Sequence, residues 1–348
     1  MRRILIATGI SLWGLYLRFH YLAHRDWWTD ECNQWNATLG ALKPFWQRLP
    51  NGELTCFPGD YLLTYPFVQI FQHNKWGVAI PHIIVTLVGF YFLYLICQRY
   101  LKTTWATAIA FIAYSLNFEL IFHAFELRPY AVLSTLGLMI FYCTETLISS
   151  KYRITPMKKF FIGILFFLSI LYHTYGILIV GFCAIFSIFN ELDNSSWQTI
   201  LKRISKFYII VGIISLPIWF WYASYNIGQD VTKMPTFDYI PNPLIHPFGF
   251  LKAIVGNLIN PKYLHFLLAG PLLAFIFAPK SRMKYLGFFL TLIVLPISLL
   301  CVMDASMNYW FLQRQFVWVI SLFSFFIAWG GELAWIESGA AFIKRVCR

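Results

Sequence analysis

Residues 77–97 read GVAIPHIIVTLVGFYFLYLIC, an apolar run that holds no Lys, Arg, Asp or Glu. A helix rises about 1.5 Å per residue, so a run of this length crosses the hydrocarbon core of a bilayer, which is about 30 Å thick. Comparable runs lie at residues 4–22, 104–122, 130–148, 160–173, 175–190, 207–225, 263–278, 285–303 and 312–334. The pattern predicts an all-α, polytopic membrane helix bundle of about ten transmembrane helices. Because the runs at 160–173 and 175–190 are short, the predicted number of transmembrane helices is ten to within about one or two.

The composition agrees with a membrane protein. Of the 348 residues, 59% are hydrophobic and only 12% are charged, and the mean hydropathy is +0.63. An average soluble domain carries about 25% charged residues. The 27 Lys and Arg exceed the 15 Asp and Glu, but most of them lie in short clusters between apolar runs instead of along one basic face. These features exclude the soluble, disordered and nucleic-acid-binding classes.

The basic clusters between the runs predict the orientation of the chain. If the N-terminus is inside, every segment expected inside carries Lys or Arg: Arg2 and Arg3; Arg99 and Lys102; Lys151, Arg153, Lys158 and Lys159; Lys202, Arg203 and Lys206; Lys280, Arg282 and Lys284; Lys344, Arg345 and Arg348. Cytoplasmic segments of membrane proteins carry such an excess, so both termini are predicted to be cytoplasmic. The first run follows two arginines without a small-residue cleavage site and is expected to be an uncleaved signal-anchor.

Two outside segments, residues 24–62 and 226–262, are too long to be simple turns. The chain is therefore expected to form a single transmembrane domain over residues 1–348, with interfacial helices in the first outside loop. Function is expected on that side of the membrane. Cys32 and Cys56 share the first loop, and whether they form a disulfide stays open.

The first polar candidate is the pair Asp30-Glu31, which follows two tryptophans just beyond the first run. Tryptophan favours the membrane interface, so these carboxylates are expected at headgroup depth. Adjacent residues point in different directions, so at most one of the two carboxylates faces a given substrate atom. The structural alternative is that Thr29 or Asp30 caps a helix over residues 31–49.

A second candidate lies at the end of the third run. Glu119, His123 and Glu126 follow i, i+4, i+7 spacing and are expected to share one helical face. Such a face can hold a metal, but no second ligand set accompanies it. The sequence therefore predicts no metal site and no cofactor, although a divalent metal stays open. Arg128 precedes Pro129, and its guanidinium needs either a carboxylate such as Glu126 or a phosphate.

Two weaker candidates lie later in the chain. His173 interrupts an apolar stretch near the outer face, where a buried structural histidine is the alternative. Arg314 opens the last run on the same side, and an arginine that snorkels to the interface is the alternative there.

Taken in order, these features resemble those of a known class. The chain has the Asp-Glu pair in loop one, an aromatic stretch over residues 57–63, Arg128-Pro-Tyr130 after a span, a His-Thr-Tyr-Gly break at 173–176 and Arg314 at the last span. This layout resembles the GT-C class of polytopic glycosyltransferases, in particular the branch of protein O-mannosyltransferases and lipid A aminoarabinose transferases. The resemblance implies transfer of a sugar from a polyprenyl-phosphate carrier to a lipid, glycan or protein acceptor at the outer face of a bacterial plasma (inner) membrane.

The resemblance also implies residue roles. Asp30 matches the loop-one catalytic acid and Glu31 its neighbour. Arg128 matches the region of the donor phosphate, together with Tyr130 and the adjoining Glu126. Tyr61 falls in the aromatic stretch, although Pro58-Gly59-Asp60 departs from the Pro-Pro pattern of the class, and His82 stands where many members carry an arginine.

The chemistry of the residues suits this function. Displacing a lipid phosphate from an anomeric carbon needs a base for the incoming hydroxyl and cations for the leaving phosphate. Asp30 is the expected base, Arg128 the expected phosphate ligand and Arg314 a second cation, in an inverting transfer. His173 is a further substrate-binding candidate.

Two other classes compete with a transferase. A transporter or flippase of a lipid-linked or polar substrate would place ionisable groups near the bilayer midplane and commonly shows paired repeats. Here the charges gather at one edge, and no repeat is visible. A non-catalytic membrane subunit is the third hypothesis, in which Asp30 and Arg128 would be dispensable for chemistry.

Overall fold

The computed structural model describes residues 1–39, 59–148, 154–173, 175–191, 196, 198, 207–217, 220, 282–296, 298–299 and 316–346. Every regular element within these ranges is a helix, which confirms the all-α prediction for this part of the chain. The helices are α1 (Arg2–His24), α2 (Thr29–Leu39), α4 (Gly59–Phe71), α5 (Lys75–Tyr100), α6 (Thr104–Leu116), α7 (Phe118–Phe122), α8 (Tyr130–Ile148), α9 (Pro156–Tyr172), α10 (Tyr175–Glu191), α14 (Arg282–Phe289), the π-helix η3 (Leu290–Val294) and α16 (Val317–Val346).

Three helical stretches are long and apolar enough to cross a membrane: Lys75–Tyr100, Tyr130–Leu147 and Val317–Gly339. Shorter apolar helices cover Thr104–Leu116, Tyr175–Ser187, Phe207–Pro217 and Lys284–Val294. Several predicted runs thus coincide with helices, but the count of about ten spans remains a prediction. The run at 263–278 and part of the run at 207–225 lie outside the described residues.

One predicted run is divided in the structure. The sequence predicts a single span over 104–122, whereas α6 ends at Leu116 and α7 begins at Phe118. Asn117 separates them, and its side-chain oxygen accepts a hydrogen bond from the backbone N–H of Leu120 at 3.1 Å. An Asn that caps a helix competes with continuation of the preceding helix, which explains the break.

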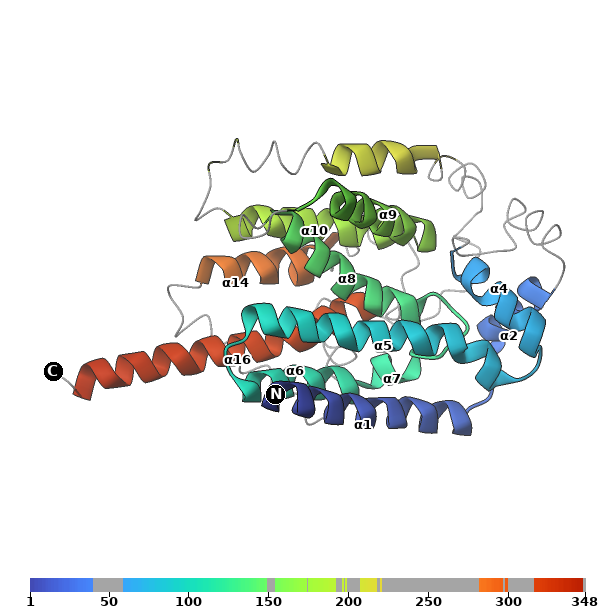
Figure 1. Cartoon of the computed structure of the whole chain (residues 1–348), viewed down its shortest axis with the longest axis horizontal. Coiled ribbons are helices and arrows are strands. Elements are labelled where there is room, and N and C mark those ends of the chain that lie inside the picture. The colour runs from blue at the N-terminus through green and yellow to red at the C-terminus, as the bar shows by residue number, and fades with distance from the viewer. Residues whose placement is uncertain are drawn as a thin grey trace, which may run out of the picture.

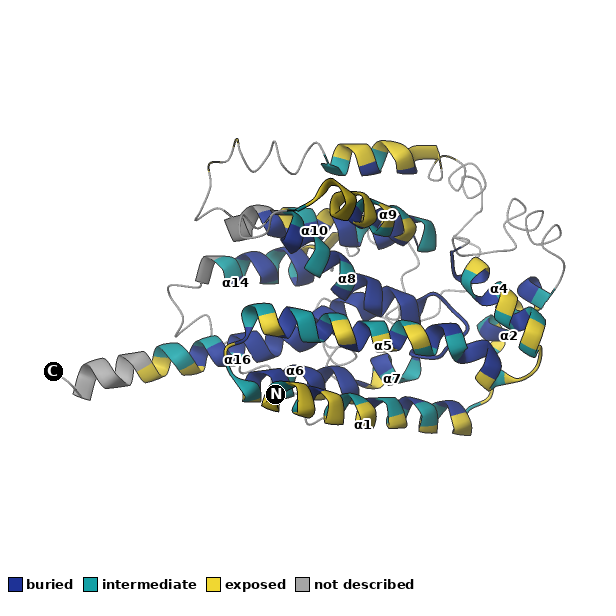
Figure 2. Ribbon diagram, in the orientation of Figure 1, coloured by how far each residue is buried: buried dark blue, intermediate teal, exposed yellow. Residues whose placement is uncertain are grey.

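The long helices run side by side, and the short ones gather at one end (Figure 1). In Figure 1, α1, α6, α5 and α16 lie along the long axis, α8 crosses between α5 and α10, and α2 and α4 lie at the end opposite both termini. The core follows α8 and the first half of α16 (Figure 2). The rings of Phe141, Phe288 and Phe325 meet there, with centroids 5.6–6.2 Å apart.

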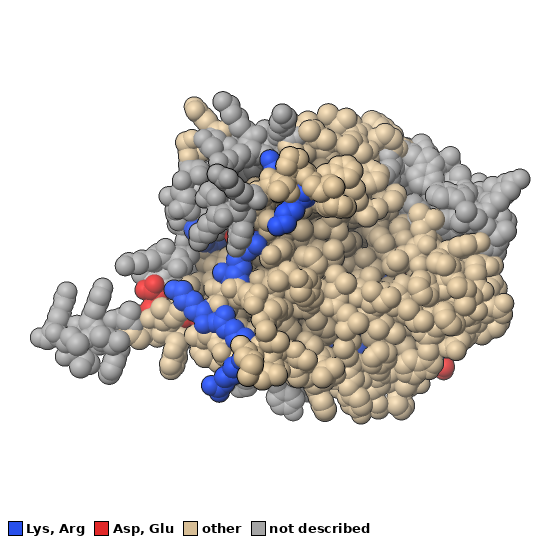
Figure 3. Space-filling model, viewed as in Figure 1, with Lys and Arg blue, Asp and Glu red and all other residues tan. Residues whose placement is uncertain are grey.

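The surface is apolar along the flanks of the bundle. Large hydrophobic side chains are exposed on α1, α5 and α9, among them Leu12, Trp13, Ile84, Tyr91 and Phe160. On the face drawn in Figure 3, Lys and Arg form a band near the end that carries the termini, and the remaining described surface on that face holds almost no charge. An apolar belt of this kind suits contact with lipid.

A buried arginine in the first run joins α1 to α6. Arg18 is 1% exposed, and it donates to the carbonyls of Gly14, Tyr114 and Ser115 at 2.8, 3.2 and 3.2 Å. Tyr114 and Ser115 belong to the last turn of α6, whose carbonyls lack helical partners. A Cβ at Gly14 would lie 2.7 Å from Ser115 Oγ, so glycine permits the close approach. The sequence did not predict a role for Arg18. In the structure its guanidinium caps the C-terminal end of α6.

The other end of α6 is tied to α16. Glu332 is buried, and its carboxylate accepts from the backbone N–H groups of Lys102 and Thr103, with closest distances of 2.8 and 2.6 Å. These N–H groups precede α6 and would otherwise be unsatisfied. Arg18 and Glu332 thus hold both ends of α6, and this framework sets the position of the segment that follows it.

Candidate functional site

The candidate site lies at the end of the bundle where α2 and α4 pack on the longer helices (Figure 1). Segments from α2, α4, α5, the α7–α8 connection and the α9–α10 turn contribute buried polar side chains: Glu31, Gln34, Asp60, His82, His123, Glu126, Arg128 and His173. Buried polar groups are costly unless they are paired, so the partners of each group define what it can do.

Asp30 and Arg128 form an ion pair. Arg128 Nη2 lies 3.3 Å from Asp30 Oδ2, and the two side chains are 7% and 27% exposed respectively. The structure therefore brings together the predicted base and the predicted phosphate ligand, which are 98 residues apart. Arg128 does not pair with the carboxylate of Glu126, the sequence alternative; its backbone N–H instead donates to the Glu126 carbonyl at 2.8 Å.

Glu31 is fully enclosed and holds the start of α2 in place. Its carboxylate accepts two bonds from the guanidinium of Arg25, one of them at 2.9 Å, and the backbone N–H groups of Leu127 and Trp28 at 2.8 and 3.4 Å. Burial lowers the pKa of Arg25, but the bonds and charge of Glu31 outweigh it, so the pKa is raised overall. With both oxygens occupied, Glu31 suits a positioning role better than a role in proton transfer.

His123 bridges the two glutamates that share its predicted face. Its Nδ1 bonds to the Glu126 carboxylate, and its Nε2 lies 3.4 Å from Glu119 Oε2. Burial alone would lower the pKa of His123, but the two carboxylates raise it to about 9, so the ring is an imidazolium at neutral pH. Among the described residues no group of three His, Cys, Asp or Glu side chains is arranged to hold a metal ion. This cluster is an ionic bridge in which Glu126 has His123, and not Arg128, as its partner.

A second buried cluster centres on Asp60, which the sequence analysis did not predict as a site residue. Its carboxylate accepts from Gln34, from His82 Nε2 at 2.9 Å and from the hydroxyl of Tyr172 at 2.9 Å. Burial opposes the charge, but these three donors together keep the pKa of Asp60 below its usual value. Asp60, in the stretch Pro58-Gly59-Asp60, and His82 both stand at positions where the sequence differs from the GT-C pattern that it resembles. In the structure Asp60 and His82 bind each other. The fact that both residues differ from the pattern was the signal in the sequence that could have predicted this pair.

The remaining predicted residues lie around these clusters. His173 is buried, stacks on Tyr175 with centroids 5.1 Å apart and accepts the Tyr175 backbone N–H at Nδ1. The Tyr130 ring lies 5.4 Å from that of His123 and 6.4 Å from that of His173. Tyr61 is buried in α4. Arg314 and Cys56 lie outside the described residues. The role of Arg314 as a second cation therefore stays a prediction, and the pairing of Cys56 with Cys32 stays open.

The helix α2 connects the two clusters. Asp30 and Gln34 are one helical turn apart and therefore share a face, from which Asp30 reaches Arg128 and Gln34 reaches Asp60. Any displacement of α2 therefore disturbs both clusters together.

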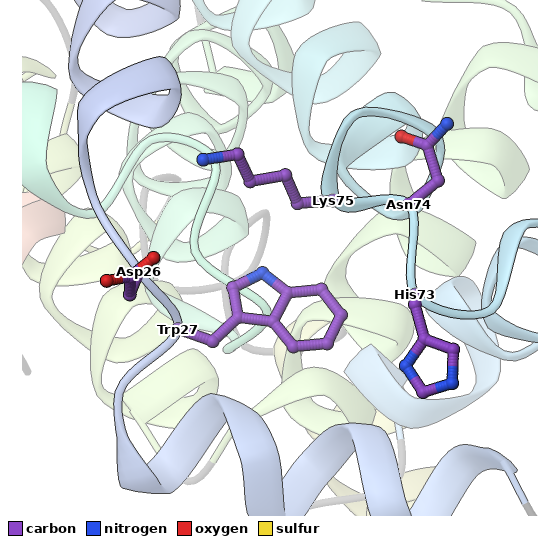
Figure 4. Close-up of a pocket in the computed structure, with 5 residues that line it drawn as sticks. All are labelled: Asp26, Trp27, His73, Asn74 and Lys75. Carbon is purple, nitrogen blue, oxygen red and sulfur yellow. The ribbon is translucent and has the colours of Figure 1, made fainter.

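An open pocket of about 470 Å³ lies beside these clusters, between the α1–α2 link and the α4–α5 turn. Its lining residues are Asp26, Trp27, His73, Asn74 and Lys75 (Figure 4). In Figure 4 the Lys75 side chain extends across the pocket toward the segment that carries Asp26, and the Trp27 indole lies between that segment and His73. The ammonium of Lys75 donates to the carbonyls of Ala23 and Arg25, both at 3.1 Å.

The fold and the site together define an all-α protein with membrane-length apolar helices and a cluster of buried ion pairs at one end. Comparison with protein-family models, curated proteins and solved structures gives no match.

Proposed function

We propose that this protein is an integral-membrane glycosyltransferase of the GT-C type, which moves a sugar from a polyprenyl-phosphate donor to an acceptor at the outer membrane face. The observation that carries the proposal is the Asp30–Arg128 pair, a carboxylate and a guanidinium 3.3 Å apart. The carboxylate is partly open to incoming molecules, and the site lies at the end of the bundle remote from the termini. A base beside a cation is what displacement of a phosphate by a hydroxyl requires.

The membrane setting supports the same proposal. The donor carries its phosphate at headgroup depth while its prenyl tail remains in lipid. A polar site at the end of an apolar bundle provides both environments, because the exposed hydrophobic side chains on the flanks can contact the tail. The basic band in Figure 3 lies near the opposite end, which agrees with an outward-facing site under the positive-inside rule.

In the proposed reaction the acceptor hydroxyl gives its proton to the Asp30 carboxylate. The acceptor oxygen forms a bond to the anomeric carbon of the donor sugar as the bond between that carbon and the phosphate oxygen breaks. The electron pair of the broken bond remains on the phosphate, and Arg128 stabilises the added charge. A single displacement of this kind inverts the anomeric configuration.

In the free protein Asp30 is the partner of Arg128, and the incoming phosphate competes for the same guanidinium. Donor binding therefore loosens the carboxylate from its cation at the stage when a base is needed. Glu31 and Gln34 hold α2 in place during this exchange, because Glu31 binds the backbone of Leu127 and Gln34 binds Asp60 on α4.

The experiment is mass spectrometry of the lipids that copurify with the protein. We expect a polyprenyl-phosphate sugar with the wild-type chain and at least a ten-fold lower yield with Arg128→Ala, since a bond to a charged group contributes about 1.5–3 kcal/mol. Arg2→Ala, an exposed arginine at the opposite end, is the control and should retain the lipid. A wild-type preparation without any sugar-phosphate lipid, or an Arg128→Ala variant that retains it in full, would contradict the proposal.

A further inference from the structure

The transfer chemistry described above gives no role to the five residues that line the pocket: Asp26, Trp27, His73, Asn74 and Lys75. One of its lining residues, Trp27, also packs against a small apolar cluster of Val68, Val78 and Leu127. The pocket nevertheless belongs to the same end of the bundle as the Asp30–Arg128 pair. Trp27 and Asp30 are three residues apart, so their Cα atoms are within about 11 Å of each other.

Two aromatic residues that line the pocket, Trp27 and His73, lie on either side of the ring of Trp35. The centroids of Trp27 and Trp35 are 5.9 Å apart, and those of Trp35 and His73 are 4.8 Å apart. Trp35 Nε1 donates to the Gln72 carbonyl at 2.9 Å, which holds its ring in position. Trp27 is half-buried and packs against the apolar cluster. Fixed indole rings that remain partly open offer a flat apolar surface without a further loss of side-chain freedom on binding.

The polar groups of the pocket offer both acceptors and donors. The Asp26 side chain is exposed and has no hydrogen-bond partner among the described residues. Lys75 uses two of its three N–H donors on main-chain carbonyls and keeps one. The side-chain oxygen of Asn74 caps α5 by accepting from Trp76 and Gly77, which leaves its NH₂ group as a donor.

The charges argue against an anionic ligand. Asp26 and Lys75 cancel, and the Lys75 ammonium is already engaged with two carbonyls. A phosphate in this pocket would meet the carboxylate of Asp26. A neutral polyhydroxylated ligand fits better, because its hydroxyls pair with a carboxylate and with N–H donors while its C–H faces rest on the indole.

We propose that this pocket binds a neutral saccharide, and that it holds the acceptor glycan whose hydroxyl Asp30 deprotonates. The second part rests on the proposed glycosyltransferase function. The first part does not, because binding of a saccharide is measured without turnover.

The test uses the purified full chain in nanodiscs and saturation-transfer NMR with four free trisaccharides: maltotriose, cellotriose, mannotriose and chitotriose. Glucose 6-phosphate serves as the anionic comparison. We expect at least one trisaccharide to bind and glucose 6-phosphate not to compete with it. Trp27→Ala should weaken this binding at least ten-fold, and Asp26→Asn, at an exposed position, should weaken it without affecting folding.

The control is Trp76→Ala, which removes an exposed tryptophan outside the pocket and should leave binding unchanged. A second arm displays the bound trisaccharide on a lipid in the nanodisc. Tighter binding there assigns the pocket to a glycolipid, and equal binding assigns it to a free or protein-borne glycan. Absence of binding to all four trisaccharides, equal binding of glucose 6-phosphate, or full binding by both pocket variants would overturn the proposal. Arg128→Ala should lower donor capture at least ten-fold without changing saccharide binding, so failure of the proposed transfer and failure of the pocket are distinguishable.

Discussion

Two carboxylates are candidate partners for Arg128: that of Glu126, two residues before it, and that of Asp30 on α2. It pairs with Asp30, and Glu126 pairs instead with His123. Each cation thus has its own carboxylate: the imidazolium of His123 pairs with Glu126, and the guanidinium of Arg128 pairs with Asp30. This division leaves the partly exposed carboxylate next to the arginine, where an incoming substrate can reach both groups.

At this residue scale, Asp30→Asn should lower turnover about 10²–10⁴-fold, the range typical of loss of a general base. The amide keeps the size and the hydrogen-bonding shape of the carboxylate, so the affinity for the donor should change little. Initial rates with a polyprenyl-phosphate sugar measure turnover, and lipid titration measures affinity. Asn33→Ala, an exposed position on the same helix, is the control and should keep full activity. Near-normal turnover of Asp30→Asn would contradict the assignment of the base.

At the scale of elements, one carboxylate joins four helices. Asp60 on α4 accepts from Gln34 on α2, His82 on α5 and Tyr172 on α9. The helices α2 and α4 have 11 and 13 residues, lengths that are marginal for an isolated helix in water. Their position therefore depends on tertiary contacts of this kind.

We expect Asp60→Ala to lower the free energy of unfolding by about 3–5 kcal/mol, because it leaves buried donors without their acceptor. Ile70→Ala, an exposed position on the same helix, should have little effect in the same thermal unfolding measurement. In a double-mutant cycle, Asp60→Asn and His82→Gln together should cost less than the sum of the single changes, by about 0.5–3 kcal/mol. Additive effects would show that the two side chains do not interact.

At the scale of the whole molecule, charge and polarity are separated along the bundle. The buried ionic clusters lie at the end formed by α2 and α4, and the basic band lies toward the termini (Figures 1 and 3). If the bundle spans a membrane, we expect the basic end to lie on the cytoplasmic side.

Cysteine labelling tests this orientation. On a background without the seven native cysteines, a membrane-impermeant reagent added from outside should modify Asn33→Cys and not Lys158→Cys. Both positions are exposed, so a difference in labelling reports the side of the membrane and not burial. Labelling of Lys158→Cys, alone or together with Asn33→Cys, would contradict the orientation.

The sequence by itself determined where several of the helices lie. The runs at 77–97 and 130–148 lie within the helices Lys75–Tyr100 and Tyr130–Ile148, because an apolar segment that crosses a membrane must satisfy its backbone hydrogen bonds internally. The spacing of Glu119, His123 and Glu126 likewise indicated a cluster, but the predicted single helical face was wrong: α7 ends at Phe122, and His123 meets Glu126 in the turn that follows it.

Only the tertiary structure decided which charges are partners. Asp30 and Arg128 are 98 residues apart and Asp60 and His82 are 22 apart, so neither pairing follows from a local period. Arg18 stands in an apolar run with no sign in its neighbours that it caps α6. The physical reason is that each buried charge must find a counter-charge or a hydrogen-bonding group, and which one it finds depends on how the helices pack.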